Sequence, residues 1–314
     1  MLTSVPLFRA LIENIPDCRI TLIASPDNIK AVRQNEMLSN IILFDKKKLF
    51  SVRYIKYLAT QLRGKKFELG LVPVTVSISF TSGILVRLAK CKYLIGPSSL
   101  DGKLFSGRFL FNSAVDFDWR ENTDVHISKR ILKILEPIKI STKNLRSHIL
   151  ITETDRVYAD KFFNGVDKPK IGLHIGAGKI QNRWSVDNFA ELMNKLNSKY
   201  NPFFFLTVGQ MDEELYNQLH KMINFDLIPM RTQTIPQIAA VIEKSDLFIS
   251  NDTGIMHVAG VTNCPMISLF GPTNPKMWSP IGENKYFIKK ENDINSIQVD
   301  DVLEFAERIL NETY

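Results

Sequence analysis

Short apolar runs alternate with segments of helical periodicity along the first half of the chain. The apolar runs that predict buried strands cover residues 20–24, 41–44 and 67–72, and two further short apolar runs lie at 93–96 and 109–111. The periodic segments, which predict helices, cover residues 49–62, 84–90 and 127–135. This repeated alternation is typical of a parallel sheet with helices on both faces.

The same alternation restarts after residue 168. Strands are predicted at residues 171–175, 203–208, 227–230, 247–250 and 266–270. Helices are predicted at residues 186–196, 213–222, 235–243 and 299–310. We therefore expect an α/β protein of two Rossmann-like domains, residues 1–150 and 151–314, joined near 150–168 with a ligand cleft between them. We also allow for the last helix packing back toward the N-terminal domain.

The first half begins directly with a helix. Apolar residues recur at helical spacing through residues 1–15, with Arg9 and Glu13 among them, which excludes a secretory or transit peptide. A Rossmann-like domain ordinarily begins with a strand whose loop faces the ligand. We therefore expect that the first β-strand of the N-terminal domain, with its loop, is missing from this sequence.

The most informative stretch follows the apolar run at 247–250. Asp252, Thr253 and Gly254 open a helix, and His257 lies one turn into it. Backbone amides and the positive end of a helix dipole suit a phosphate or pyrophosphate, and ligands of open parallel sheets bind at the carboxyl ends of the strands. An ordinary capped turn between a strand and a helix explains the same residues equally well.

Three other turns of the second half point toward the same sheet edge. The first contains small residues at 176–178, where the backbone can approach a ligand, and Arg183, which can bring charge to a phosphate. The second places Glu213 in a first helical turn, where a carboxylate either favours the dipole or accepts hydrogen bonds from a ribose. The third, residues 230–234, offers backbone that can border a base.

Composition limits the class of protein. With 314 residues, of which 45% are hydrophobic, the chain can build two sizeable cores, and no stretch approaches the ~20 apolar residues of a membrane span. The three cysteines are far apart and form no CxxC pair, which predicts a reducing, cytoplasmic location. The signatures of a P-loop, a zinc protease and a serine hydrolase are absent from the sequence.

The chain is basic, with a net charge of +7. Its basic clusters are short, at residues 46–48, 63–66 and 129–133, and no aromatic ladder accompanies them, so we expect no nucleic-acid partner. Solvated loops and helix faces explain most such clusters. The alternative is attraction to an anionic membrane surface.

The string D-T-G-x-x-H…P-x-x-x-L-F-G-P-T-x-P at residues 252–275, with the turns at 176–178, 182–184 and 209, resembles glycosyltransferase family 9. These are the ADP-heptose:lipopolysaccharide heptosyltransferases. The resemblance implies the GT-B fold, no metal or other cofactor, and transfer of heptose with inversion from ADP-heptose to an inner-core sugar. It also implies two partners, the nucleotide-sugar donor and the lipopolysaccharide core acceptor, in the cytoplasm or peripherally at the inner face of the inner membrane.

The resemblance also assigns roles to residues of the second half. The diphosphate and heptose of the donor would contact Asp252, Thr253, Gly254 and His257. Ala177 and Gly178 would flank the phosphates, Glu213 would bind the ribose, and backbone at Thr232 and Gln233 would border adenine. The family commonly has a Lys where this sequence has Asn182, so Arg183 or Lys179 would have to replace its charge.

The general base implied by the resemblance is an Asp in the first loop, which would precede Met1. No catalytic residue is therefore assigned in this sequence. We expect a start site placed too far downstream, or else a truncated copy. Three functions stay open: a heptosyltransferase, a catalytically impaired nucleotide-sugar-binding homologue without the base, and a nucleotide-sugar epimerase of the same architecture.

Overall fold

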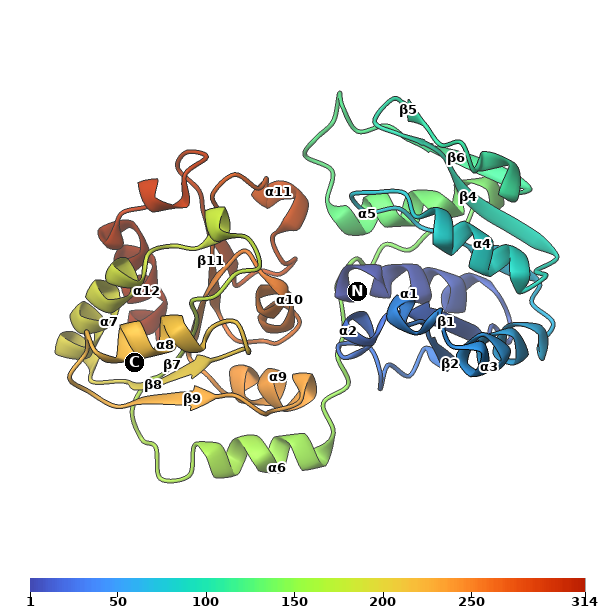
Figure 1. The fold of residues 1–314 in the computed structure, drawn as a ribbon. Helices are drawn as coiled ribbons and strands as arrows, with labels where there is room; N and C mark the ends of the chain where they lie inside the picture. The colour runs from blue at the N-terminus through green and yellow to red at the C-terminus, as the bar shows by residue number, and fades with distance from the viewer. Residues whose placement is uncertain (314) are drawn as a thin grey trace. The chain divides into compact units, whose positions relative to one another are not determined.

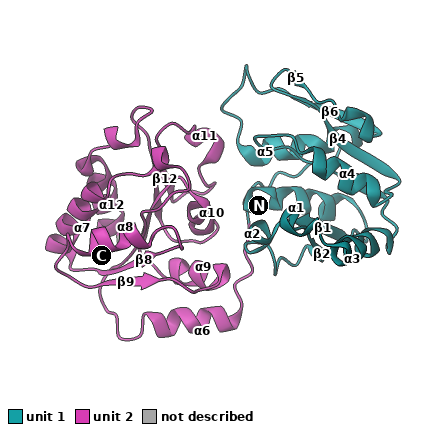
Figure 2. Ribbon diagram, viewed as in Figure 1, with its two compact units in different colours: residues 1–147 teal, residues 148–314 magenta. Residues whose placement is uncertain are grey.

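The computed structural model describes residues 1–313. The chain divides into two compact units, residues 1–147 and residues 148–314 (Figure 2), and each is described by itself. Among the described residues, none of the helices combines the length and apolar character needed to cross a membrane.

The strands of the first unit form two separate sheets (Figure 1). In the smaller sheet, β1 (Ile20–Ala24) pairs in parallel with β2 (Leu38–Leu43). In the larger sheet, β4 (Tyr93–Leu100) pairs in parallel with β3 (Leu69–Leu71) on one side and β6 (Ser113–Phe117) on the other. A short antiparallel strand, β5 (Lys103–Leu104), follows β4 and pairs with its end.

The helices of the first unit are α1 (Val5–Asn14), α2 (Pro26–Ile29), α3 (Val52–Arg63), α4 (Phe80–Leu88) and α5 (Ile127–Leu132). One apolar cluster connects the smaller sheet to the helices that follow it. Ile42 of β2 packs with Leu58 and Leu62 of α3 and with Leu85 of α4. Burying each of these side chains stabilises the unit by about 1.5–3 kcal/mol. The prediction of a missing first strand is not tested by this arrangement and stays a prediction.

The second unit contains one sheet of six parallel strands, in the order β12-β11-β10-β7-β8-β9. The strands are β7 (Lys170–His174), β8 (Phe203–Thr207), β9 (Leu227–Met230), β10 (Leu247–Asn251), β11 (Met266–Leu269) and β12 (Lys285–Ile288). The helices are α6 (Glu153–Phe162), α7 (Val186–Tyr200), α8 (Glu213–His220), α9 (Ile235–Glu243), α10 (Gly254–Gly260), α11 (Pro275–Trp278) and α12 (Val299–Thr313).

This strand order reverses direction between β7 and β10. The chain proceeds from β7 outward through β8 and β9, then crosses back to β10 and continues outward on the other side. The loops that leave β7 and β10 therefore diverge to opposite faces of the sheet. In doubly wound sheets, ligands bind at the carboxyl ends of the strands where the strand order reverses in this way.

The core of the second unit explains why its elements were the easiest to predict. The central strands are continuous buried runs, because helices cover both faces of the sheet. On one face, Phe189 of α7 and Val302 of α12 pack with Leu173 and Ile249 of the strands. Amphipathic helices and all-apolar strands give strong sequence signals, which match the observed bounds here to within a few residues.

Several elements differ from the sequence-based expectation. Helix α6 occupies residues that we expected to be a connection; Thr152 and Asp155 form a capping box at its start, and Arg156 pairs with Glu243 of α9 at 2.7 Å. Strands β6 and β12 were not predicted. Helix α12 packs on α7, β10 and β11 of its own unit; its packing toward the N-terminal domain is not tested and stays a prediction.

Candidate functional site

Asn251, at the end of β10, joins the two loops of the switch point. Its side chain is completely buried; Nδ2 donates to the carbonyl of Ile175 at 2.8 Å, and Oδ1 accepts from the backbone N of Trp184 at 3.2 Å. Both partners lie in the segment that leaves β7. A single buried amide thus fixes the spacing between the loop after β7 and the loop after β10, because an unpaired partner would cost about 1–3 kcal/mol.

Asn182 and Asp252, one from each of the two loops, are hydrogen-bonded to each other. Asn182 Nδ2 donates to Asp252 Oδ2 at 3.2 Å, which brings together two of the residues predicted from sequence. Asn182 is only 8% exposed, and its Oδ1 has no hydrogen-bond partner among the described residues. Burial raises the pKa of the Asp252 carboxyl, while a hydrogen bond from Thr273 and the charge of Lys179 act in the opposite direction.

The glycine-rich loop after β7 is open on one side and closed on the other. A Cβ placed on Gly178 or Gly254 would meet no heavy atom within 4 Å, so both backbones face open space. A Cβ on Gly176 would collide with the buried carboxylate of Asp212. Arg183 Nε donates to the carbonyl of Ala177 at 2.8 Å, which holds the guanidinium against this loop.

Helix α10 begins at Gly254 with Thr253 as its N-cap. The Thr253 hydroxyl accepts from the backbone N of Ile255 at 3.1 Å, so it is engaged in capping. The helix has seven residues, which limits the dipole that it can present to an anion. His257 follows one turn later, with its ring 6.4 Å from that of Trp278. Any anion held here therefore depends on side chains and loop amides more than on the helix dipole.

Glu213 and Gln233 lie at the carboxyl ends of β8 and β9, on the other side of β7. Glu213 pairs with Arg231 at 2.9 Å, and the Arg231 guanidinium stacks on the Tyr216 ring at 4.6 Å. Gln233 Nε2 donates to the hydroxyl of Tyr158 at 2.8 Å. Both predicted residues thus share the sheet edge expected for them, but each is engaged with another side chain.

Several site-forming residues had no assignment from sequence. Asn251, Arg231 and Tyr158 act through partners that are remote in the chain, so no local pattern identifies them. Asp212 accepts from the Gly209 backbone N at 2.9 Å. His174, expected to be a packed strand residue, is buried, and its Nδ1 lies 2.9 Å from Thr207 Oγ1. Burial lowers the pKa of His174.

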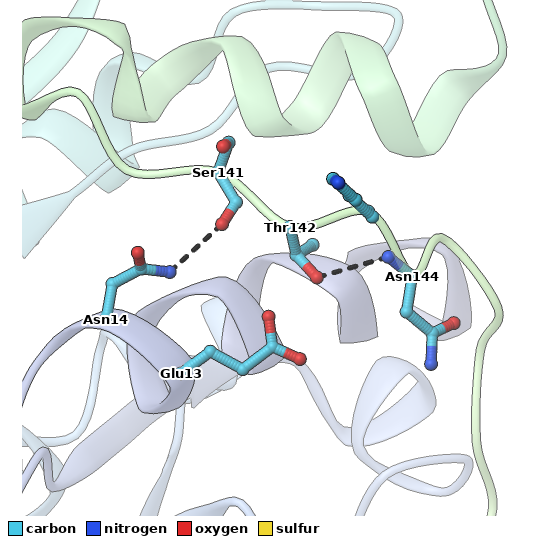
Figure 3. Close-up of a pocket in the computed structure, with 6 residues that line it drawn as sticks. Glu13, Asn14, Ser141, Thr142 and Asn144 are labelled. Carbon is cyan, nitrogen blue, oxygen red and sulfur yellow. Dashed lines mark hydrogen bonds between the residues drawn. The ribbon is translucent and has the colours of Figure 1, made fainter.

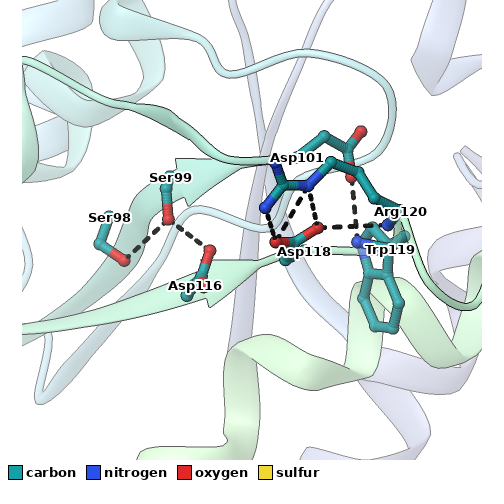
Figure 4. A network of polar contacts seen from close by, with 7 residues as sticks. All are labelled: Ser98, Ser99, Asp101, Asp116, Asp118, Trp119 and Arg120. Carbon is teal, nitrogen blue, oxygen red and sulfur yellow. Dashed lines mark hydrogen bonds and ion pairs between the residues drawn. The ribbon is translucent and has the colours of Figure 1, made fainter.

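The first unit has a polar network at the carboxyl ends of β4 and β6 (Figure 4). Ser99 donates to Asp116, and Asp101 accepts from the backbone N of Trp119 at 3.0 Å. Hydrogen bonds from Arg120 lower the pKa of the exposed Asp118 carboxyl to about 2. A carboxylate with such a low pKa is a poor general base at neutral pH.

A shallow pocket of the first unit lies between the end of α1 and residues 141–144 (Figure 3). Asn14 Nδ2 donates to the Ser141 carbonyl at 3.0 Å across it, and Arg9 donates to the carbonyls of Asn144 and Arg146, both at 2.8 Å. These bonds tie the first helix to the end of the unit. We interpret the pocket as part of the packing between α1 and the end of the unit.

Comparison with known proteins gives consistent results. Residues 55–303 match the model of glycosyltransferase family 9 (heptosyltransferase). Lipopolysaccharide core heptosyltransferase OpsX of Haemophilus influenzae is 24% identical over 261 residues, which cover 81% of this chain and 72% of that protein. 

Two solved structures are similar in fold. One is a glycosyl transferase family 9 protein from Veillonella parvula, with a TM-score of 0.84, 20% identity, and coverage of 99% of this chain and 94% of that one. The other is the ADP-heptose lipopolysaccharide heptosyltransferase II of Escherichia coli, with a TM-score of 0.81, 20% identity, and coverage of 100% and 96%. The fold is the GT-B fold of these enzymes. Since the family model spans well over half of the sequence, the chain belongs to glycosyltransferase family 9 and is a glycosyltransferase.

Proposed function

We propose that the chain transfers a heptose from ADP-heptose to the inner core of lipopolysaccharide, with inversion and without a metal ion. The main support is the set of loops at the β7–β10 switch point, where Asn182 and Asp252 meet and the backbones of Gly178 and Gly254 face open space. The similarity to a lipopolysaccharide core heptosyltransferase and to an ADP-heptose heptosyltransferase supports the substrate class.

The donor would lie along the carboxyl ends of the strands. We assign the diphosphate to the loop amides around Ala177, Gly178, Thr253 and Gly254, and the adenosine to the Glu213 and Gln233 side. Departure of ADP develops negative charge on the diphosphate, which fixed donors must stabilise when no metal ion is used. Arg183 supplies a guanidinium at this loop and His257 a further polar group.

Asp252 is suited to the sugar more than to the phosphates. A carboxylate beside a diphosphate is repelled by it, whereas hydroxyl groups of a heptose donate to a carboxylate at charge-assisted strength. Asn182 is buried and donates to Asp252 Oδ2, which orients the carboxylate. We therefore propose that Asp252, positioned by Asn182, holds heptose hydroxyls, while the loop amides hold the diphosphate.

The reaction also needs a base to deprotonate the acceptor hydroxyl. No residue of the sequence is assigned as this base. A second function is supported by one observation: Asn182 stands where the family commonly has a Lys, which removes a positive charge from the donor site. That function is nucleotide-sugar binding without transfer.

One experiment separates the two functions. Binding of ADP-heptose is measured by calorimetry, and transfer is measured on a heptose-deficient core acceptor dispersed in detergent, with and without a chelator. Transfer that persists with chelator and yields the inverted anomer, read by NMR coupling constants, is the expected result. Micromolar binding without transfer favours the binding homologue, and release of free nucleotide with an altered sugar in the absence of acceptor indicates an epimerase. No ADP-heptose binding contradicts the proposal.

We further propose that the chain works at the cytoplasmic face of the inner membrane, where an acceptor anchored by lipid A is present. The supporting observation is its surplus of Lys and Arg, which suits an anionic acceptor or membrane.

A further inference from the structure

The positive charge of the chain is concentrated in one short segment. Residues 46–67 contain eight Lys and Arg and no Asp or Glu. The whole chain has 40 basic and 33 acidic residues, so outside this segment the charges nearly balance, at 32 against 33. The basic clusters at 46–48 and 63–66, which look short and separate in the sequence, flank the two ends of helix α3.

The same segment exposes large apolar side chains. Phe50, two residues before α3, is 96% exposed, and Val52, the first residue of α3, is 67% exposed. Ile55 and Tyr57 follow in the helix, each 47% exposed. Scattered exposed apolar residues are common on protein surfaces. A run of aliphatic and aromatic side chains within eight residues, surrounded by lysines, is the composition of an element that lies in a lipid interface.

The buried face of α3 is formed by two other apolar residues of the helix. Leu58 and Leu62 are buried against Ile42 of β2, so the helix is anchored in the core of the first unit by one stripe. Its other faces present Arg53, Lys56 and Arg63 to solvent. The exposed apolar residues are therefore not needed to hold the helix in the core, and a binding partner can bury them.

The basic side chains are available as well. Lys48 lies 3.8 Å from Asp45, which gives it a weak pairing. Within the described part of the chain, no carboxylate lies within ion-pair distance of the other seven. An anionic surface would therefore meet cations that do not first have to be released from internal ion pairs.

We propose that residues 46–67 form an interfacial element that docks the protein on an anionic lipid surface, with Phe50 and Val52 entering the boundary between headgroups and acyl chains. Charge complementarity favours an anionic surface. The exposed apolar residues favour lipid over nucleic acid, because contact with phosphates does not bury apolar side chains in an apolar environment. The proposal rests on the proposed function only in that a lipid-anchored acceptor lies at such a surface.

The test is co-sedimentation with vesicles that contain neither donor nor acceptor, so its outcome is independent of transfer. The full-length chain is expected to bind vesicles of phosphatidylcholine with phosphatidylglycerol, to bind pure phosphatidylcholine at least tenfold more weakly, and to lose binding at high salt. Binding that is equal for both lipids, or absent from both, overturns the proposal.

Three variants locate the surface. Replacing the three lysines at 46–48 by glutamine is expected to weaken binding to the anionic vesicles about 100-fold, because each basic residue near such a surface contributes about fivefold. Phe50→Ser is expected to weaken it about tenfold through lost apolar burial. The matched control removes three exposed lysines elsewhere, Lys103→Gln, Lys161→Gln and Lys221→Gln, and is expected to retain at least a third of the affinity.

A control triple variant that loses as much binding as the test triple variant contradicts the location and leaves only a net-charge effect. Retention of binding by Phe50→Ser contradicts insertion of the apolar residues. Binding of RNA or DNA in preference to vesicles, lost in the 46–48 variant, would identify a nucleic-acid surface and overturn the proposal. Thermal unfolding and ADP-heptose binding in detergent, which are expected to be unchanged in all variants, exclude misfolding.

Discussion

Asp252→Asn separates the role of this carboxylate in the fold from its role with the donor. Asparagine has nearly the same shape, and its side-chain oxygen can still accept from Asn182 Nδ2, which donates to Asp252 Oδ2 at 3.2 Å in the structure. The substitution therefore removes a negative charge while keeping the internal hydrogen bond. If the carboxylate accepts from heptose hydroxyls, loss of a charge-assisted bond of about 1.5–3 kcal/mol should weaken ADP-heptose binding about 10- to 100-fold.

Binding of ADP alone should respond differently. ADP has no heptose hydroxyls for Asp252 to accept from, and the carboxylate repels its diphosphate, so the affinity for ADP should be unchanged or higher in Asp252→Asn. Calorimetric titration with both ligands measures this contrast. Equal losses for ADP and ADP-heptose would refute the assignment of Asp252 to the sugar, and unchanged affinity for both would refute its place in the site.

The same variant has an effect on stability whose sign follows from the pKa. Burial raises the pKa of Asp252 in the folded protein, so the folded state holds this proton more tightly than the unfolded state, whose pKa is about 4. The stabilisation that comes from this tighter proton binding is fully present below the unfolded pKa and is lost as pH rises through the folded pKa. At pH 7 the ionised carboxylate therefore lowers stability, and Asp252→Asn should raise the melting temperature at pH 7 and lose this advantage in acid. Glu304→Gln, at an exposed position inside α12, is the matched control and should change the melting temperature at neither pH.

Three further changes test the scaffold of the site. Asn251→Ala leaves the Ile175 carbonyl and the Trp184 backbone N unpaired, so it should lower the unfolding free energy by about 2–5 kcal/mol in a denaturant titration; a loss below about 1 kcal/mol would show that the two loops are held by other contacts. Gly176→Ala introduces a methyl group against the Asp212 carboxylate and should weaken ADP binding about tenfold or more while the protein still folds; unchanged affinity would show that the loop can move aside. Burial raises the pKa of the Cys264 thiol well above its ordinary value, so Cys264 should react with a thiol reagent only after unfolding, whereas rapid labelling of the native protein would contradict its burial.

The sequence predicted the second unit better than the first. Strand 227–230 and helix 235–243 begin and end where predicted, because buried strands and amphipathic helices leave strong periodic signals. Helix α6 was missed because its apolar face is short and its start is defined by the Thr152–Asp155 capping box. Strand β6 was missed because its sequence, Ser-Ala-Val-Asp-Phe, alternates weakly and its apolar residues are few.

The residues of the candidate site also divide into those that the sequence identified and those whose contacts it did not predict. The turn at 252–254 was identified from a polar break after an apolar run, and its family string indicated the enzyme class, which the family match confirms. The ion pair of Glu213 with Arg231 and the bond from Gln233 to Tyr158 were not predictable, because their partners come from other elements. The roles assigned to the individual donor-site residues stay predictions until a ligand is bound.

By itself, the sequence determined the type of each long element, the division into two α/β halves and the family. These properties are recorded in local periodicity and in short strings of residues, which need no knowledge of distant contacts. Only the tertiary structure decided which residues meet: the reversal of strand order between β7 and β10 brings Asn182 to Asp252, seventy positions away. It also decided that two separate basic clusters flank one helix with an exposed apolar start, because exposure depends on what the rest of the chain leaves uncovered.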